Sequence, residues 1–113
     1  MRLLNKTKNT YLAQDVIIAR TFFSRAKGLL GRRQFKGPQA IVLKPCSSIH
    51  TFFMRFPIDV IFVDRDNKVV GAISSIRPFR LSPIYFNSRF AIELPSGTLN
   101  STSTQTGDTV LLE

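Results

Sequence analysis

The sequence predicts a mainly β fold, a small sandwich or partly closed barrel of short strands with one helix at about residues 21–31. Short β-rich segments separated by turn residues fill the chain after residue 38. No segment there is long enough for the crossover helices that parallel strands require. With 113 residues, 43% of them hydrophobic, the chain is expected to fold around one core as a single domain, residues 1–113.

The strands follow from residue patterns. The opening "LLNKTKNTYLAQDVIIA" predicts short strands broken by a polar turn at residues 5–9. Asp66-Asn67 suits the left-handed backbone of a hairpin turn, and Gly107-Asp108 leads from the polar loop "LNSTSTQTGD" into the last strand. Six later segments are rich in β-branched and aromatic residues: "AIVLKP", "IHTFFM", "IDVIFV", "KVVGAISSI", "FAIELP" and "TVLLE".

One stretch has helical periodicity instead. Thr21 is suited to an N-cap and Gly31 to a C-cap. The apolar residues between them recur at helical spacing: Phe22, Phe23, Ala26, Leu29 and Leu30. We therefore expect a helix that packs these side chains against the sheet.

The net charge of +9 is distributed unevenly. Residues 1–44 hold ten Lys or Arg and one acid, Asp15, whereas residues 45–113 hold six of each sign. A basic half can attract nucleic acid, anionic lipid or acidic ligands. We expect no specific nucleic-acid binding, because no helix-turn-helix, zinc-finger or paired aromatic motif accompanies the charge.

Apolar runs are short throughout the chain. None approaches the roughly 20 residues of a transmembrane helix, and the first ten residues lack the apolar core of a signal peptide. We therefore expect a cytoplasmic protein without a transmembrane segment. The lone cysteine, Cys46, excludes an internal disulfide and agrees with a reducing compartment.

Cys46, His50 and Met54 recur at every fourth position, so a regular strand would point all three to one face. Such a strand would also separate Cys46 from His50 by roughly 13 Å, too far to share an ion or a proton. A bend at Ser47-Ser48 would bring them together as a soft metal site or a Cys-His nucleophile. No fourth ligand is evident, so we expect no metal. Otherwise Cys46 packs as a small apolar side chain and His50 satisfies a polar neighbour.

Asp59 is a carboxylate inside the apolar strand "PIDVIFV", so it must have hydrogen-bond partners if buried. We expect it to be mostly buried and held by two or more donors. Glu93 in "FAIELP" repeats the pattern and is expected to face the same pocket. A phenylalanine exposed beside His50 and Asp59 would give that pocket an apolar wall, and the stretch from Arg77 to Arg80 together with Tyr85 could line it.

Four separated blocks carry a family resemblance. "KGLLGR", "CSSIHTFFMRFPIDVIFVDRDNKVV", "AIELPSGT" and "GDTV" together resemble the domain of unknown function family 192, from about Val16 to Leu112. The resemblance implies a mainly β fold with a single helix and no established activity. Met54, Pro57 and Asp59 match the broader family pattern. Other members have an aromatic residue near the position of His50 and no cysteine at that of Cys46, which argues against a shared Cys-His catalyst.

The sequence thus favours an uncharacterised binding or accessory module over an enzyme. Its candidate site lies around His50, Met54 and Asp59, with Cys46 and Glu93 as further ligand-binding candidates. One alternative is a small hydrolase or transferase that uses Cys46 or His50. Another is a basic accessory protein that contacts nucleic acid or an anionic surface. The sequence identifies neither a cofactor nor a partner, and a small-molecule or anionic ligand is the candidate that it leaves open.

Overall fold

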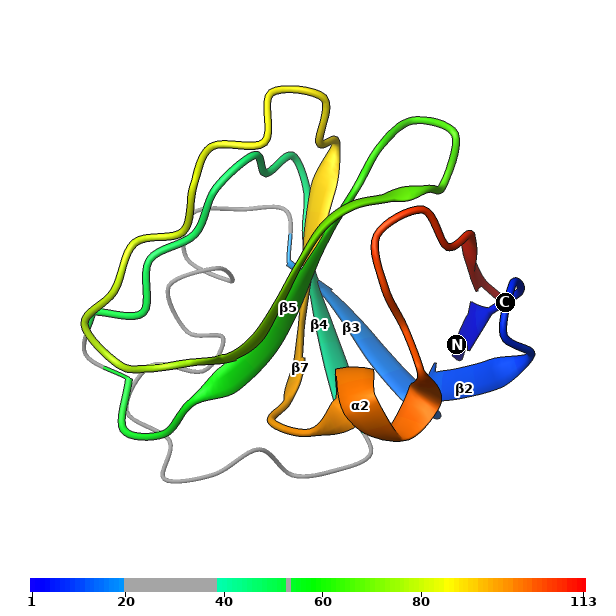
Figure 1. Ribbon diagram of the computed structural model, residues 1–113, viewed down its shortest axis with the longest axis horizontal. Helices are drawn as coiled ribbons and strands as arrows, with labels where there is room; N and C mark the ends of the chain where they lie inside the picture. The colour runs from blue at the N-terminus through cyan, green and yellow to red at the C-terminus, as the bar shows by residue number, and fades with distance from the viewer. Residues whose placement is uncertain (20–38, 53) are drawn as a thin grey trace.

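The computed structural model describes residues 1–19, 39–52 and 54–113 (Figure 1). The helix expected over residues 21–31 lies outside this part of the chain. The described elements are β1 (Leu3–Asn5), β2 (Thr10–Ala13), β3 (Asp15–Ala19), β4 (Gln39–Leu43), β5 (Ile58–Val63), β6 (Val69–Ile76), β7 (Phe90–Pro95), α2 (Thr98–Thr102) and β8 (Val110–Leu112).

Two sheets account for the strands, and they do not close into a barrel. The five-stranded sheet has the order β3-β4-β7-β5-β6, in which only β3 and β4 pair in parallel. The three-stranded sheet, β2-β1-β8, is antiparallel. The prediction of a mainly β fold is therefore confirmed.

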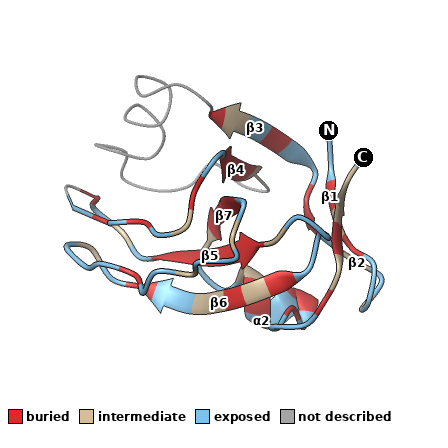
Figure 2. Cartoon of the chain, turned by 90° about the horizontal axis from the view of Figure 1, so that it is seen from above, coloured by how far each residue is buried: buried red, intermediate tan, exposed pale blue. Residues whose placement is uncertain are grey.

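Two apolar clusters cover the faces of the larger sheet. One cluster fills the space between the two sheets and α2, and includes Leu3, Leu12, Ile61, Ile92 and Leu99. The other lies on the opposite face and includes Ile41, Met54, Val60, Phe62 and Ala91. β5 is central to both because all six of its residues are buried (Figure 2). Such a continuous apolar run is typical of a strand covered on both faces.

Local turn predictions are confirmed, whereas one strand prediction is wrong. Asn67 has a φ of 63° in the β5–β6 hairpin, and Gly107 has a φ of 97° before β8. "IHTFFM" is not a strand, since its described residues form only one isolated bridge, between His50 and Leu81. The polar loop before β8 begins with α2, a helix that the sequence did not predict. No helix among the described residues is long and apolar enough to span a membrane.

Candidate functional site

Asp59 is fully buried in β5, and backbone amides hold both of its carboxylate oxygens. Its Oδ1 accepts a hydrogen bond from the amide of Ser75 at 2.8 Å. Its Oδ2 accepts from the amides of Gly97 at 3.1 Å and Leu99 at 2.8 Å, at the start of α2. The prediction of a buried Asp59 held by two or more donors is confirmed. Its carboxylate joins β5 to β6 and caps the orphan amides of α2.

Glu93 does not share the surroundings of Asp59. In the β5–β7 ladder Asp59 pairs with Leu94, whereas Glu93 pairs with Val60. Directly paired residues point to the same face of a sheet and successive residues point to opposite faces. The expectation that both carboxylates face one pocket is therefore wrong, because the sheet separates them. Glu93 is buried on the face that carries Val60.

Cys46 and Met54 are buried together in that second apolar cluster. The Cys46 thiol donates a hydrogen bond to the carbonyl of Ser48 at 3.0 Å. Both side chains thus contribute to packing, as the structural interpretation of the sequence expects. Across residues 1–19, 39–52 and 54–113, no three His, Cys, Asp or Glu side chains form a group that could hold a metal ion.

His50 is the exposed member of the candidate set. Its ring stacks on Phe52, with the ring centroids 5.1 Å apart and an interplanar angle of 28°. Met54 is buried in the second apolar cluster, and the carboxylate of Asp59 is bonded to the amides at the start of α2. The candidate site therefore divides into buried residues that hold the fold and an exposed pair, His50 and Phe52.

This exposed pair lies on the first of two loops that run side by side, residues 44–52 and 77–89, called here the paired loops (Figure 1). Five backbone hydrogen bonds of 2.8–3.0 Å join them: Cys46 to Arg89, Tyr85 to Ser47, Ser82 to Ile49, Thr51 to Arg80 and Phe79 to Thr51, donor first. A long irregular segment is thus held almost as a strand pair is held, so its outer side chains have fixed backbone positions.

Thr51 is the polar centre of the paired loops and is fully buried. Its hydroxyl donates to the carbonyl of Arg77 at 2.5 Å and accepts from the amide of Arg80 at 2.9 Å. The Ser82 hydroxyl plays a similar part, accepting from the amide of Ile49 at 2.9 Å. These two hydroxyls satisfy backbone groups that a regular ladder would otherwise satisfy.

The paired loops expose several large apolar side chains. Leu81 is 71% exposed and Phe86 is 88% exposed, while Ser82 and Tyr85 between them point inward. Eight large hydrophobic side chains are exposed in the described part of the chain. Five of them lie on these loops, and they form what we call the loop surface: Phe52, Phe79, Leu81, Ile84 and Phe86. Such a concentration marks an interaction site more often than scattered exposed residues do.

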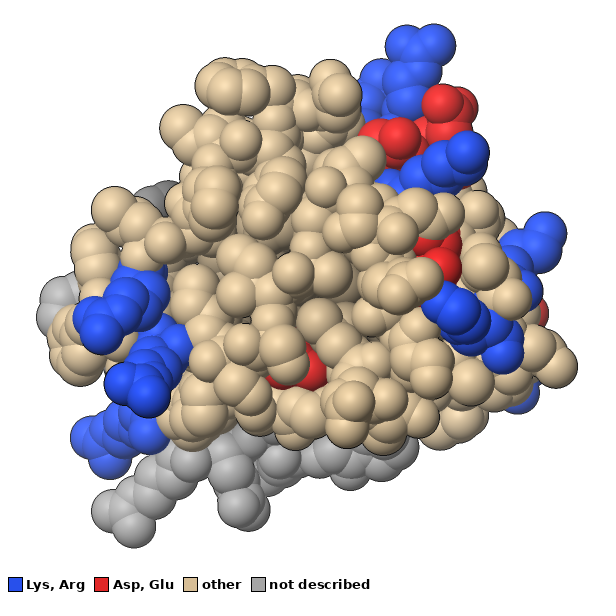
Figure 3. All heavy atoms as spheres, in the orientation of Figure 1, with Lys and Arg blue, Asp and Glu red and all other residues tan. Residues whose placement is uncertain are grey.

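Charge on the paired loops has one sign. They contain Lys44, Arg77, Arg80 and Arg89, all exposed, and no Asp or Glu. On the side of the molecule where the paired loops lie, Figure 3 shows basic side chains without acids beside them. The basic side chains at the other end of that view are interspersed with acids. The paired loops therefore present exposed apolar side chains together with a positive charge that no acid of the loops themselves balances.

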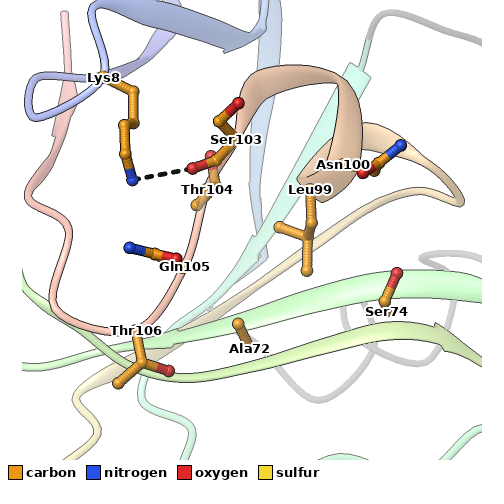
Figure 4. Close-up of a pocket in the computed structure, with 9 residues that line it drawn as sticks. All are labelled: Lys8, Ala72, Ser74, Leu99, Asn100, Ser103, Thr104, Gln105 and Thr106. Carbon is orange, nitrogen blue, oxygen red and sulfur yellow. Dashed lines mark hydrogen bonds between the residues drawn. The ribbon is translucent and has the colours of Figure 1, made fainter.

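A groove of about 540 Å³ lies elsewhere, between β6, α2 and the segment that follows α2 (Figure 4). Hydroxyl and amide groups line most of it, and Lys8 is its one charged lining residue. The ammonium of Lys8 already donates to the carbonyl of Ser103 at 3.0 Å and to both oxygens of Asp108 at 3.1 Å. The groove thus offers neutral polar groups, and it contains no candidate residue from the sequence.

Sequence reasoning missed Leu81, Ile84 and Phe86 as surface residues and Thr51 as their support. A partial signal was present, because residues 77–89 contain three arginines and no acid around five large apolar side chains. Phe52 is the described phenylalanine that meets half of the condition set for an apolar pocket wall, since it is exposed and stacks on His50. The other half is not met, because Asp59 is buried and bonded at α2.

Comparison with known proteins places the chain among uncharacterised relatives. The family DUF192, described as an uncharacterised ACR, matches residues 3–112. A UPF0127 protein of Thermococcus sibiricus is 34% identical over 112 residues, which cover 96% of this chain and 72% of that protein. A UPF0127 protein of Pyrococcus horikoshii is 34% identical over 115 residues, covering 96% of each chain.

Two solved structures share the fold. A protein of unknown function from Novosphingobium aromaticivorans matches with a TM-score of 0.85 at 20% identity, covering 99% of this chain and 84% of that one. A putative transcription regulator from Sinorhizobium meliloti matches with a TM-score of 0.78 at 20% identity, covering 97% of this chain and 89% of that one. At this identity the likeness is one of fold alone.

Proposed function

The chain belongs to the uncharacterised DUF192 family, and from this premise we propose that it is a binding module that holds an anionic amphipathic partner on its loop surface. The observation that carries the proposal is the combination of five exposed apolar side chains with basic residues and no acid on the paired loops. An apolar part of the partner would cover the apolar side chains, and its negative charge would pair with the arginines.

Preorganisation supports this surface as a binding site. The hydrogen bonds of the paired loops and the buried hydroxyl of Thr51 fix the backbone before any partner arrives. Binding to an ordered backbone avoids the entropic cost of ordering a mobile loop. The apolar side chains themselves lie outside the two apolar cores, so covering them would not disturb the fold.

A pair of small amphiphiles tests the proposal. Octyl phosphate and octyl glucoside share the same apolar tail and differ in charge, and each is titrated below its micelle concentration into isotopically labelled protein. We expect octyl phosphate to shift the amide resonances of residues 79–86, and octyl glucoside to shift them more weakly, because only the phosphate pairs with the arginines. Shifts confined to the groove residues 103–106, or equal effects of the two amphiphiles, would refute the proposal.

A further inference from the structure

We infer that the anionic partner of the loop surface is the face of a lipid bilayer with acidic headgroups, an inference that rests on the proposed function. The protein would lie on the bilayer, with the apolar side chains of the loop surface at the boundary of headgroups and acyl chains. The neighbouring arginines would lie among the phosphates.

The two aliphatic members of the loop surface suit acyl chains better than nucleobases. Binding to single-stranded nucleic acid depends on aromatic faces on which bases stack. Leu81 and Ile84 are 71% and 57% exposed and have no such face. His50 and Phe52 already stack on each other, which leaves fewer ring faces open to a base. An acyl chain, in contrast, packs against aliphatic and aromatic side chains alike.

The charge of the paired loops disfavours a second copy of the chain as the partner of the loop surface. In a symmetric dimer the same patch meets itself. Lys44, Arg77, Arg80 and Arg89 would then face like charges with no acid of the paired loops between them. Like charges placed across an interface oppose association. A surface rich in phosphate complements this patch, whereas the patch does not complement itself.

The position of the arginines suits a flat anionic surface. Arg77 and Arg80 flank the exposed Phe79, and both are exposed. Their long side chains can keep the guanidinium groups at headgroup level while Phe79 and Leu81 lie deeper. Acidic lipid and exposed apolar groups would then contribute together, and membrane affinity should fall when either is removed.

Vesicle sedimentation tests the inference. The full chain is mixed with phosphatidylcholine vesicles, with and without phosphatidylglycerol, at low and high salt. We expect binding to the acidic vesicles that weakens at high salt, and little binding to the neutral ones. Arg77→Gln with Arg80→Gln should lower the partition coefficient by roughly 25-fold, at about fivefold per arginine near the surface. Arg65→Gln with Lys68→Gln, in the β5–β6 hairpin, is the matched charge control and should change it little.

Leu81→Ser with Ile84→Ser tests whether apolar side chains of the loop surface contribute to lipid binding. On acidic vesicles this pair should reduce partition at least tenfold, because two apolar side chains no longer enter the interface. Equal binding of the parent and this variant to the vesicles would overturn the inference. So would tighter binding to poly-uridine than to acidic vesicles. If the protein does not bind acidic vesicles but octyl phosphate still shifts the amide resonances of residues 79–86, the inference of a bilayer partner is wrong and the loop surface is still a binding site. If both fail, the proposed function is wrong as well.

Discussion

Two irregular regions of the molecule are each organised by one buried polar side chain, and they differ in what they present to solvent. At α2, the carboxylate of Asp59 accepts hydrogen bonds from three backbone amides, so both of its oxygens are bonded within the fold. At the paired loops, the hydroxyl of Thr51 also forms hydrogen bonds with the backbone, at Arg77 and Arg80. The loops that it joins, however, expose large apolar side chains to solvent. A buried polar residue can therefore serve as a structural support, and at the paired loops the proposed binding surface lies on the outside of the backbone that Thr51 supports.

The largest expected effect is at the α2 region. Asp59→Ala would remove the acceptor of three backbone amides, of which that of Leu99 belongs to a buried residue, and should cost about 3–5 kcal/mol of unfolding free energy. Urea unfolding of the parent and the variant measures this loss. Under conditions where the variant is folded, its affinity for octyl phosphate should equal that of the parent. An unchanged unfolding free energy in Asp59→Ala would contradict the structural role assigned to Asp59.

Gly71→Ala tests how the paired loops are anchored to the sheet. The ring of Tyr85 covers Gly71 and stacks on Phe62, with the ring centroids 4.4 Å apart. A methyl group at position 71 would collide with that ring, so we expect a loss of about 1–3 kcal/mol. Tyr85→Leu in the same background should relieve part of the loss, because a smaller side chain frees the space. Full stability of Gly71→Ala alone would show that Tyr85 is not fixed there.

Thr51→Val examines the hydroxyl beneath the paired loops. The shape of the side chain is kept, but the hydrogen bonds to Arg77 and Arg80 are lost, at about 1–2 kcal/mol. Hydrogen exchange of the amides in residues 79–82 should speed up more than that of the amides in β5. Thr51→Ser keeps the hydroxyl and serves as the control. Equal exchange rates of these amides in Thr51→Val and Thr51→Ser would show that the hydroxyl of Thr51 does not support the paired loops.

A smaller effect is expected at Asp108, away from both regions. Burial raises the pKa of Asp108, but hydrogen bonds from Asn5, the amide of Gln105 and the Lys8 ammonium outweigh it and hold the pKa below its ordinary value. A carboxyl group with a lowered folded-state pKa adds stability above its unfolded pKa, and this is lost as pH falls through the folded one. Asp108→Asn should therefore be less stable than the parent at neutral pH. The gap should narrow in acid, and a gap independent of pH would contradict this.

The sequence predicted what depends on neighbours along the chain. The hairpin at Asp66-Asn67 and the burial of Asp59 follow from adjacent residues, because the turn residues and the apolar run are local. The donors to Asp59 could not be predicted, since Ser75 lies 16 residues away and Leu99 lies 40. α2 could not be predicted for the same reason. Its Ser- and Thr-containing sequence is typical of a loop, and the acceptor for the amides of Gly97 and Leu99 is the distant Asp59 on β5.

The candidate site was predicted in part for a similar reason. The sequence raised an exposed phenylalanine beside His50 only as a condition for an apolar pocket, and "IHTFFM" was expected as a strand because of its β-rich composition. The hydroxyl of Thr51 instead bonds to backbone 26 and 29 residues away, which gives that segment an irregular partner. Pairing at such separations depends on the assembled fold, so the residue pattern of 77–89 was only a partial signal for the exposure of Leu81 and Phe86.

The most direct test of the central claim is the dissociation constant for octyl phosphate of the protein carrying Ile84→Ser and Phe86→Ser. Both side chains are exposed, at 57% and 88%, so the unfolding free energy should stay within about 0.5 kcal/mol per substitution of the parent value. Binding should weaken at least tenfold, while the exposed Ile17→Ser control on β3 binds as the parent does. An unchanged dissociation constant in the double variant would contradict the claim that the loop surface is the functional surface of this protein.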